Sequence, residues 1–238
     1  MDELRPGLLG WTARHPEWRT TVEEVGSYAV VAHDGLALVD ALLPPEGDPA
    51  RVPLLAEIDR RVTGSDRLEI LVVSPYHTRS AEELWQRYRE RLPARIWGHP
   101  RTAARFTDPS TPLDEIPRGP AGGGRAFADG IAVAYVISRP ARQETPLYLP
   151  AAKAVAFADA VVGDGRGLRV WNDTDIAHDS LRKRLHPTLA PLLELDVDHV
   201  LVTHGPPVLD GGREALAAAL EAEPVDQLPW PPRGDAAS

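Results

Sequence analysis

Apolar and polar positions along the chain follow two periodicities, which predict strands in some segments and helices in others. Short runs rich in β-branched and apolar residues predict strands at 25–32, 36–40, 68–74, 95–98, 131–137, 147–149, 154–157 and 199–203. Apolar residues spaced three or four apart predict helices at 52–62, 80–91, 180–195 and 212–223. Hairpins come first, and strands then alternate with helices. This order favours a pair of mixed sheets with helices outside over a purely parallel sheet.

Local signals refine this pattern. The run 68–74, LEILVVS, is apolar apart from Glu69 and Ser74, which is typical of a strand covered on both faces. Ser80 and Glu83 have the spacing of a capping box, so we expect the Ser80 hydroxyl to cap the helix that follows. Pro187 lies inside the predicted helix at 180–195 and should kink or interrupt it. The Pro- and Gly-rich segment 107–124 is predicted to be a long surface loop.

The composition excludes several classes of function. The chain has 238 residues, with 26 Lys+Arg against 35 Asp+Glu and a formal net charge of −9. This acidic balance argues against nucleic acids and anionic membranes as partners, because both polyanions would be repelled. The chain has no cysteine, which removes disulfides, thiolate metal ligands and cysteine nucleophiles together.

Length and hydrophobic content indicate how the chain is organised. They predict a single domain over residues 1–223, followed by a flexible C-terminal tail over 224–238 that is rich in Pro, Asp and Ala. The N-terminal MDELRPGLLGW has neither the basic nor the apolar region of a signal peptide. The apolar runs are too short to cross a bilayer. We therefore expect a cytoplasmic protein.

One segment carries a specific resemblance. Residues 70–84, ILVVSPYHTRSAEEL, join a buried strand to a helix, and they resemble the metallo-β-lactamase fold superfamily, where such a strand enters a T-H-x-H-x-D-H loop. The hairpin ending at Asp40, the LYLPAAKAVAFAD segment ending at Asp159, and VLVTHG with His204 follow in the order of that superfamily. The resemblance covers roughly residues 25–220. It implies an α/β (α+β) fold, an αββα sandwich of two mixed sheets flanked by helices, with a metal site at one edge.

The same resemblance shows which metal ligands are retained in the first motif. The alignment sets Ser74 on the motif's Thr, Pro75 on the first His, His77 on the second, Arg79 on the Asp and Ser80 on the last His. Only one histidine of this motif is therefore retained. A register shifted by two residues, with His77 on the first His and Glu82 on the last, is the alternative.

The later ligand positions are also altered. Residues 139–142, Arg-Pro-Ala-Arg, lie where the family has a Pro-Gly-His stretch, so the resemblance places Arg142 on the third His. Asp159 matches the carboxylate that bridges two metals, and His204 matches the final His. In the family His77 and His204 belong to different metal positions. The resemblance therefore leaves each position with two ligands at most.

Arginine at these positions works against a metal cation. A guanidinium has only hydrogen-bond donors and a permanent charge, so it cannot ligate. At about 4 Å and an effective dielectric constant of ~20, it repels a divalent ion by roughly 8 kcal/mol before screening. Zinc hydrolases use about three protein ligands and an open water position. We therefore expect the dinuclear zinc site to be lost.

Two functional hypotheses follow. The first is a hydrolase-like protein of this fold without resident cofactor, acting as a ligand-binding module or pseudo-enzyme. In it, Arg79 and Arg142 fill the vacated space, either pairing with Asp159 or binding an anionic small molecule. The second is a hydrolase of an ester, thioester, lactone or phosphoester that uses one divalent ion (zinc, iron or manganese) held by His77, Asp159 and His204. The plain alternative is that these three residues have only structural roles.

Overall fold

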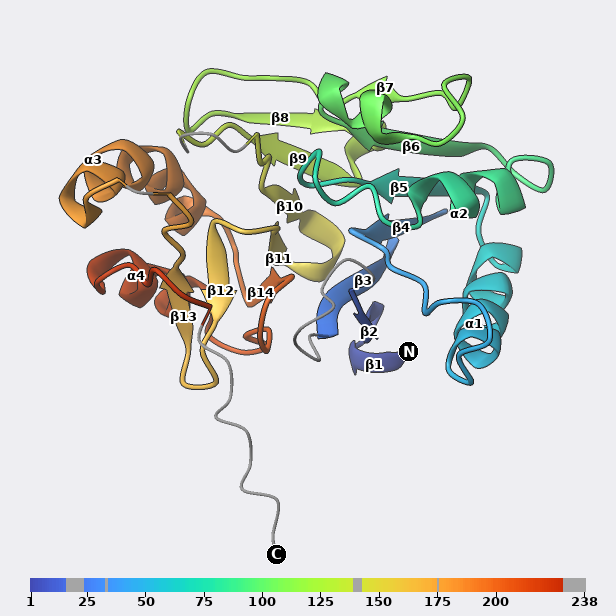
Figure 1. Cartoon of the computed structure of the whole chain (residues 1–238), viewed down its shortest axis with the longest axis horizontal. Helices are drawn as coiled ribbons and strands as arrows, with labels where there is room; N and C mark the ends of the chain where they lie inside the picture. Colours follow the sequence, from blue (N-terminus) through green and yellow to red (C-terminus); the bar gives the residue numbers. More distant parts are fainter. Residues whose placement is uncertain (16–23, 33, 139–142, 175, 229–238) are drawn as a thin grey trace, which may run out of the picture.

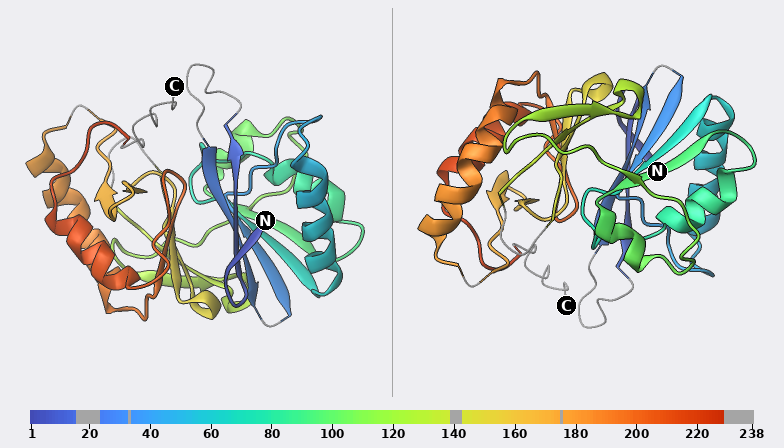
Figure 2. Two further views of the ribbon diagram at one scale, coloured as in Figure 1. Left: turned by 90° about the horizontal axis from the view of Figure 1, so that it is seen from below. Right: turned by 90° about the horizontal axis from the view of Figure 1, so that it is seen from above.

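The computed structural model describes residues 1–15, 24–32, 34–138, 143–174 and 176–228. Two sheets pack face to face, and helices cover the outer face of each (Figures 1 and 2). This is an αββα sandwich, so the predicted fold class is confirmed.

The first sheet has seven strands in sequential order. They are β1 (Asp2–Arg5), β2 (Leu8–Arg14), β3 (Glu24–Ala32), β4 (Gly35–Val39), β5 (Arg67–Leu71), β6 (Ala94–Gly98) and β7 (Asp114–Glu115). The first four strands pair antiparallel, and β4 to β7 pair parallel. The parallel half places the carboxyl ends of β4 and β5 next to each other at one edge of the sandwich.

The second sheet has five strands in the order β14-β11-β10-β9-β8. They are β8 (Gly124–Phe127), β9 (Ala132–Tyr135), β10 (Leu147–Leu149), β11 (Ala154–Phe157) and β14 (His199–Val202). A separate hairpin pairs β12 (Val161–Gly163) with β13 (Leu168–Val170). Strands β11 and β14 pair parallel, so their carboxyl ends also lie side by side.

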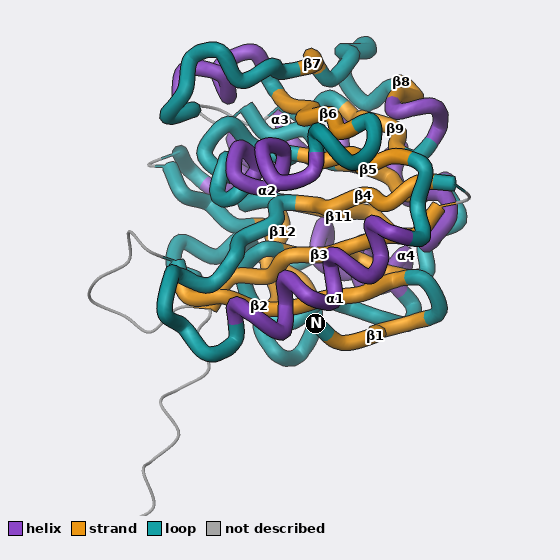
Figure 3. The backbone as a smooth tube through the Cα atoms, turned by 90° about the vertical axis from the view of Figure 1, so that its right-hand side faces the viewer, coloured by secondary structure: helices purple, strands orange, loops and turns teal. Residues whose placement is uncertain are grey.

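Among the described residues, four α-helices form the outer layers. Helices α1 (Arg51–Thr63) and α2 (Ala81–Tyr88) lie over the first sheet, as Figure 3 shows, and α3 (His178–Leu189) and α4 (Gly212–Glu221) lie over the second. Short 3₁₀ helices are η1 (Pro100–Arg105), η2 (Ala128–Gly130), η3 (Pro150–Ala152) and η4 (Ala190–Glu194). Among the described residues, none of these helices is both long enough and apolar enough to traverse a bilayer.

Of four hydrophobic clusters among the described residues, the three large ones hold these layers together. The central one lies between the sheets and includes Leu8, Tyr28, Leu71, Leu147 and Leu201. A second joins the first sheet to α1 and α2, and a third joins the second sheet to α3 and α4. Strand β5 contributes to two of the clusters, because its alternate side chains face opposite sides of the sheet. This agrees with its largely apolar sequence, in which the buried Glu69 is the exception and accepts from the Trp97 ring N–H at 2.6 Å.

Some local expectations are wrong. Ser80 does precede α2, but its side chain makes no cap hydrogen bond; its hydroxyl instead accepts from the Leu43 N–H at 2.9 Å. The helix predicted over 180–195 is interrupted as expected, although beyond Pro187: α3 ends at Leu189, and the 3₁₀ helix η4, which contains Pro191, follows. Strands β1, β2, β7, β8, β12 and β13 were not predicted, and β7 lies within the predicted surface loop 107–124, where it pairs with β6.

Tyr28 connects the two sheets directly. It lies on β3, is buried, and donates its hydroxyl hydrogen bond to the Val202 carbonyl of β14 at 2.7 Å. Beside it the Gly26 N–H donates to the Thr203 carbonyl at 2.7 Å. These bonds hold the end of β14 against the first sheet.

Replacing Tyr28 with phenylalanine should therefore lower the free energy of unfolding by about 1.5 kcal/mol, because the buried Val202 carbonyl loses its donor. Chemical denaturation measures this change. Tyr148→Phe is the matched control, since its hydroxyl donates to the Asp196 carbonyl at an exposed position. Equal losses in the two variants would contradict the structural role of Tyr28.

Candidate metal centre

Four side chains converge where parallel strands of both sheets end. Asp40 follows β4, and His77 lies in the loop between β5 and α2. Asp159 follows β11 by two residues, and His204 follows β14 by two residues. Binding sites of α/β proteins commonly form outside the carboxyl ends of parallel strands. The two pairs of strand ends face each other here, so residues distant in sequence form one buried cluster.

His77 is oriented by Asp40. One oxygen of this carboxylate, Oδ2, lies 2.7 Å from His77 Nδ1, and the other, Oδ1, accepts from the Val73 N–H at 2.8 Å. Asp40 therefore holds both the imidazole and the strand end that precedes it. With Nδ1 engaged, Nε2 of His77 faces Asp159. A carboxylate on the remote nitrogen is the usual second partner of a metal-binding histidine.

Asp159 lies between the two imidazoles. Its Oδ1 is 3.1 Å from His204 Nε2 and 3.4 Å from His77 Nε2. One donor atom from each of His77, Asp159 and His204 can be chosen such that all three lie within 4.8 Å of one another. Among the described residues, these three side chains form the one group of His, Asp and Glu residues that is close enough together to hold a metal ion. The three predicted ligands therefore form a single set.

The charges of the cluster are strongly coupled. Burial and the nearby Arg79 lower the pKa of His77, but Asp159 and Asp40 raise it further, to about 9. Burial raises the pKa of Asp159, but His77 and His204 lower it more, so that it lies well below the usual aspartate range. The opposing charges therefore favour the ionised form of the Asp159 carboxylate and the protonated form of His77.

Glu144 fixes the backbone around Asp159. Its carboxylate is buried and accepts from the N–H groups of Ala158, Asp159 and Ala160 at 2.9, 3.1 and 2.7 Å. These three N–H groups follow the end of β11. The buried carboxylate thus fixes this backbone segment and sets the direction in which Asp159 points.

His204 is fixed by close backbone packing. Gly205 follows it with φ +79°, and a Cβ there would lie 2.0 Å from the Gly163 carbonyl oxygen. The Gly163 N–H in turn donates to the His204 carbonyl at 2.8 Å. The Trp171 ring packs edge-on against the imidazole, with 5.6 Å between ring centroids. The backbone that carries His204 is therefore fixed, and Trp171 covers one side of its imidazole.

Arg79, the residue at the aspartate position of the motif, uses Nη1 to donate to the main-chain carbonyls of Gly26 and Asp40. The Asp159 carboxylate contacts the imidazoles of His77 and His204, and the Asp159 N–H donates to Glu144. The predicted Arg79–Asp159 pair is not among these contacts. The guanidinium is near enough to influence the pKa of His77. Arg142 lies outside the described residues.

The shifted register does not agree with the position of Glu82. Its carboxylate accepts from the N–H groups of Thr107 and Asp108 and from the Thr111 hydroxyl, at 2.8, 2.7 and 2.9 Å. Glu82 therefore anchors a surface loop to the start of α2, away from the donor group of His77, Asp159 and His204.

Sequence reasoning missed two residues of this cluster, Asp40 and Glu144. Asp40 had a detectable signal, because it directly follows a buried strand that precedes the strand leading to His77. Glu144 had none, since it lies in a polar stretch without periodicity. Its role depends on backbone groups more than a dozen residues away.

The donor set fits a divalent transition metal. Two imidazole nitrogens and one carboxylate oxygen are the ligands of several catalytic zinc sites and of the two-histidine, one-carboxylate iron sites. The second partner that such sites require is present for His77, as Asp40. All three donors are buried and belong to well-packed strand ends. The residues present therefore fit one ion, with Arg79 close by as an opposing charge.

The fold was compared with known proteins. No model of a protein family matches the chain, and a search of curated proteins also finds no match. Among solved structures, 193 chains match. Three of them are metallo-β-lactamases from Erythrobacter litoralis (with β-mercaptoethanol in its active site), Pontibacter korlensis and Hirschia baltica.

These three structures agree with the chain over most of their length. The TM-scores are 0.65, 0.62 and 0.63, and the sequence identities are 14%, 16% and 12%, in the same order. The matches cover 92%, 93% and 92% of this chain and 95%, 98% and 95% of the other chains. The resemblance seen in the sequence is thus confirmed in three dimensions. The chain has the fold of the metallo-β-lactamases.

Proposed function

We propose that the protein binds one divalent metal ion through His77, Asp159 and His204 and acts as a hydrolase of an ester, thioester, lactone or phosphoester. The observation that carries this proposal is the convergence of three donors within 4.8 Å at the carboxyl ends of parallel strands. When bound, the ion would supply Lewis acidity and a water of lowered pKa.

The residues of the chain have defined tasks in this proposal. Asp40 keeps His77 in the tautomer that leaves Nε2 free for the ion. Glu144 and the Gly163–Gly205 contact hold Asp159 and His204 in place. Arg79 places a permanent charge where a dinuclear enzyme would carry a ligand, which supports one ion rather than two.

A second candidate function is a metal-free ligand-binding protein. The observation that favours it is the bonding of Asp159 to two imidazoles, which satisfies the carboxylate without an ion. Protonated His77 then supplies a positive charge in the place of the metal. A measurement of the metal content of the purified protein decides between the two candidate functions.

Metal content is to be measured by elemental mass spectrometry on protein purified without chelator or affinity nickel and then dialysed. We expect about one equivalent of zinc, iron or manganese per chain, and less than about a tenth of an equivalent in Asp159→Asn and His204→Gln. His99→Gln is the control, because His99 caps η1 outside the donor group. Wild-type protein far below one equivalent, with none regained on soaking, would favour the metal-free candidate.

The loaded protein should hydrolyse 4-nitrophenyl acetate, a chelator should abolish this activity, and Asp159→Asn should lack it. Release of 4-nitrophenolate is followed by its absorbance, and His99→Gln should retain the wild-type rate. A rate that is indifferent to the chelator would contradict metal-dependent hydrolysis.

Replacing Asp40 with asparagine should weaken metal binding by roughly 10- to 100-fold. The amide keeps an acceptor for the Val73 N–H, but its NH₂ group can face His77 Nδ1 and drive the imidazole proton to Nε2, the atom needed for the ion. Competition with a zinc-binding dye measures the affinity. Asp34→Asn, at an exposed turn, is the control. An unchanged affinity would show that Asp40 does not set the tautomer.

A further inference from the structure

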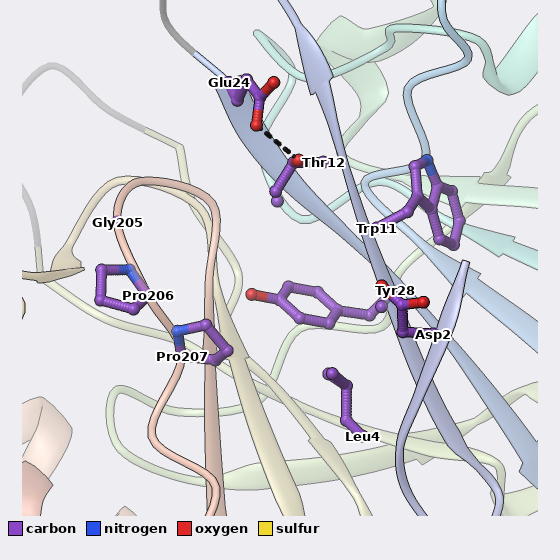
Figure 4. A pocket seen from close by; sticks show the side chains of 11 residues that line it. Asp2, Leu4, Trp11, Thr12, Glu24, Tyr28, Gly205, Pro206 and Pro207 are labelled. Atoms are coloured by element: carbon purple, nitrogen blue, oxygen red, sulfur yellow. Dashed lines mark hydrogen bonds between the residues drawn. The ribbon is translucent and has the colours of Figure 1, made fainter. Parts of the chain in front are cut away.

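An apolar pocket of about 580 Å³ lies between the first sheet and the loop that follows His204 (Figure 4). Leu4, the ring of Tyr28, and the pyrrolidine rings of Pro206 and Pro207 border it. Tyr28 extends from β3 toward the two prolines. The volume lies within the range of pockets that bind small molecules.

Two glycines leave room for the side chains that form the walls of this pocket. A Cβ on Gly10 would lie 2.7 Å from Leu4 Cδ1, and a Cβ on Gly26 would lie 2.9 Å from the Tyr28 hydroxyl oxygen. Both glycines line the pocket, so any larger side chain there would have to displace its walls. The absence of side chains at these two positions is what allows Leu4 and Tyr28 to take their places.

The pocket adjoins the candidate metal centre. Gly205, which lines it, directly follows His204. Gly26, which also lines it, accepts from Arg79 and donates to the Thr203 carbonyl. The segment that carries His204 is thus also one wall of the pocket. A molecule reacting at the metal centre could extend an attached group into this space.

The walls and the rim define the chemistry of that group. The walls are an aromatic ring, two pyrrolidine rings and a leucine, which favour a neutral apolar occupant. The rim carries Asp2, Glu24 and Thr12, with Glu24 accepting from the Thr12 hydroxyl at 2.7 Å. Two carboxylates at the rim oppose an anionic end on the bound group.

We infer that this pocket binds the neutral apolar acyl or aryl group of the substrate, so that the substrate is a hydrophobic ester or thioester. This inference rests on the proposed function. The pocket selects the substrate by the group beside the scissile bond, and the metal centre carries out the reaction. Chain length or ring size of that group should therefore determine KM.

Binding is to be tested first on chelator-treated protein with N-phenyl-1-naphthylamine, a neutral dye that fluoresces in apolar surroundings. We expect saturable binding of one dye per chain. Thr12→Trp should weaken it about tenfold or more, because an indole at the rim takes up the apolar space. Thr12 is exposed on β2, where an aromatic residue suits a strand.

Pro207→Ala is the second variant; it removes one wall and should weaken dye binding about threefold. Thr63→Trp is the matched control, since it adds the same ring at the exposed end of α1, remote from the pocket. Dye affinity unchanged in both Thr12→Trp and Pro207→Ala, or binding that does not saturate, would overturn the pocket assignment.

Hydrolysis by the metal-loaded protein then tests the link to the substrate. KM for 4-nitrophenyl hexanoate should be lower than that for the acetate, and Thr12→Trp should remove most of this difference. If Thr12→Trp loses both dye binding and the preference for the hexanoate, the inference is supported. If the preference for the hexanoate persists in Thr12→Trp, the inference is refuted. Absence of metal with normal dye binding would refute the proposed function but leave the binding pocket established.

Discussion

Replacing Glu144 with alanine is expected to lower the free energy of unfolding by about 4 kcal/mol, the largest loss we expect from a single polar side chain here. The carboxylate accepts three buried N–H groups, those of Ala158, Asp159 and Ala160. Hydrogen bonds to a charged acceptor contribute about 1.5 to 3 kcal/mol each. Removal of the buried charge itself offsets part of the loss.

Chemical denaturation measures this change, and metal content gives a second readout. Glu144→Gln should show a smaller loss, because one oxygen still accepts while the NH₂ group opposes the donors. Glu115→Ala, at an exposed position of β7, should stay within about 0.5 kcal/mol of wild type. A loss below about 1 kcal/mol for Glu144→Ala would mean that water replaces the carboxylate at these N–H groups.

Replacing Gly205 with alanine should cost at least about 3 kcal/mol and displace His204. Two causes combine at this position. The φ of +79° disfavours any residue with a Cβ, and that Cβ would lie 2.0 Å from the Gly163 carbonyl oxygen. Backbone atoms cannot move aside as a flexible side chain can, so the loop must shift.

Gly47→Ala separates the two causes. Gly47 has a similar φ of +86°, but nothing lies within 4 Å of the Cβ that alanine would add. We therefore expect it to cost only the conformational strain, about 1 kcal/mol. Thermal and chemical unfolding of both variants give the comparison, and metal content reports on His204. Similar losses in the two variants would show that the Gly163–Gly205 contact is not limiting.

Periodicity was informative wherever one face or both faces of an element are buried locally. The apolar run of β5 and the spacing in α1 identified these elements, and the strands that lead to His77, Asp159 and His204 were predicted from the same kind of signal. The N-terminal strands β1 and β2 were missed. β1 is short and mostly polar, and Gly10 interrupts the β-branched and apolar run that marks a strand in β2. Pairing of β1 with β2, and of β2 with β3, supplies the stability instead.

The sequence by itself determined the strands that lead to His77, Asp159 and His204 and the four α-helices, and thereby the strand ends at which these three residues lie. Only the tertiary structure decided what those side chains face. Asp40 meets His77 across 37 residues, and His204 meets Asp159 across 45. Arg79 bonds to carbonyls rather than to Asp159, and Ser80 bonds to Leu43 rather than to its own helix. Periodicity records burial along one segment, whereas these hydrogen bonds depend on how separate segments pack against each other.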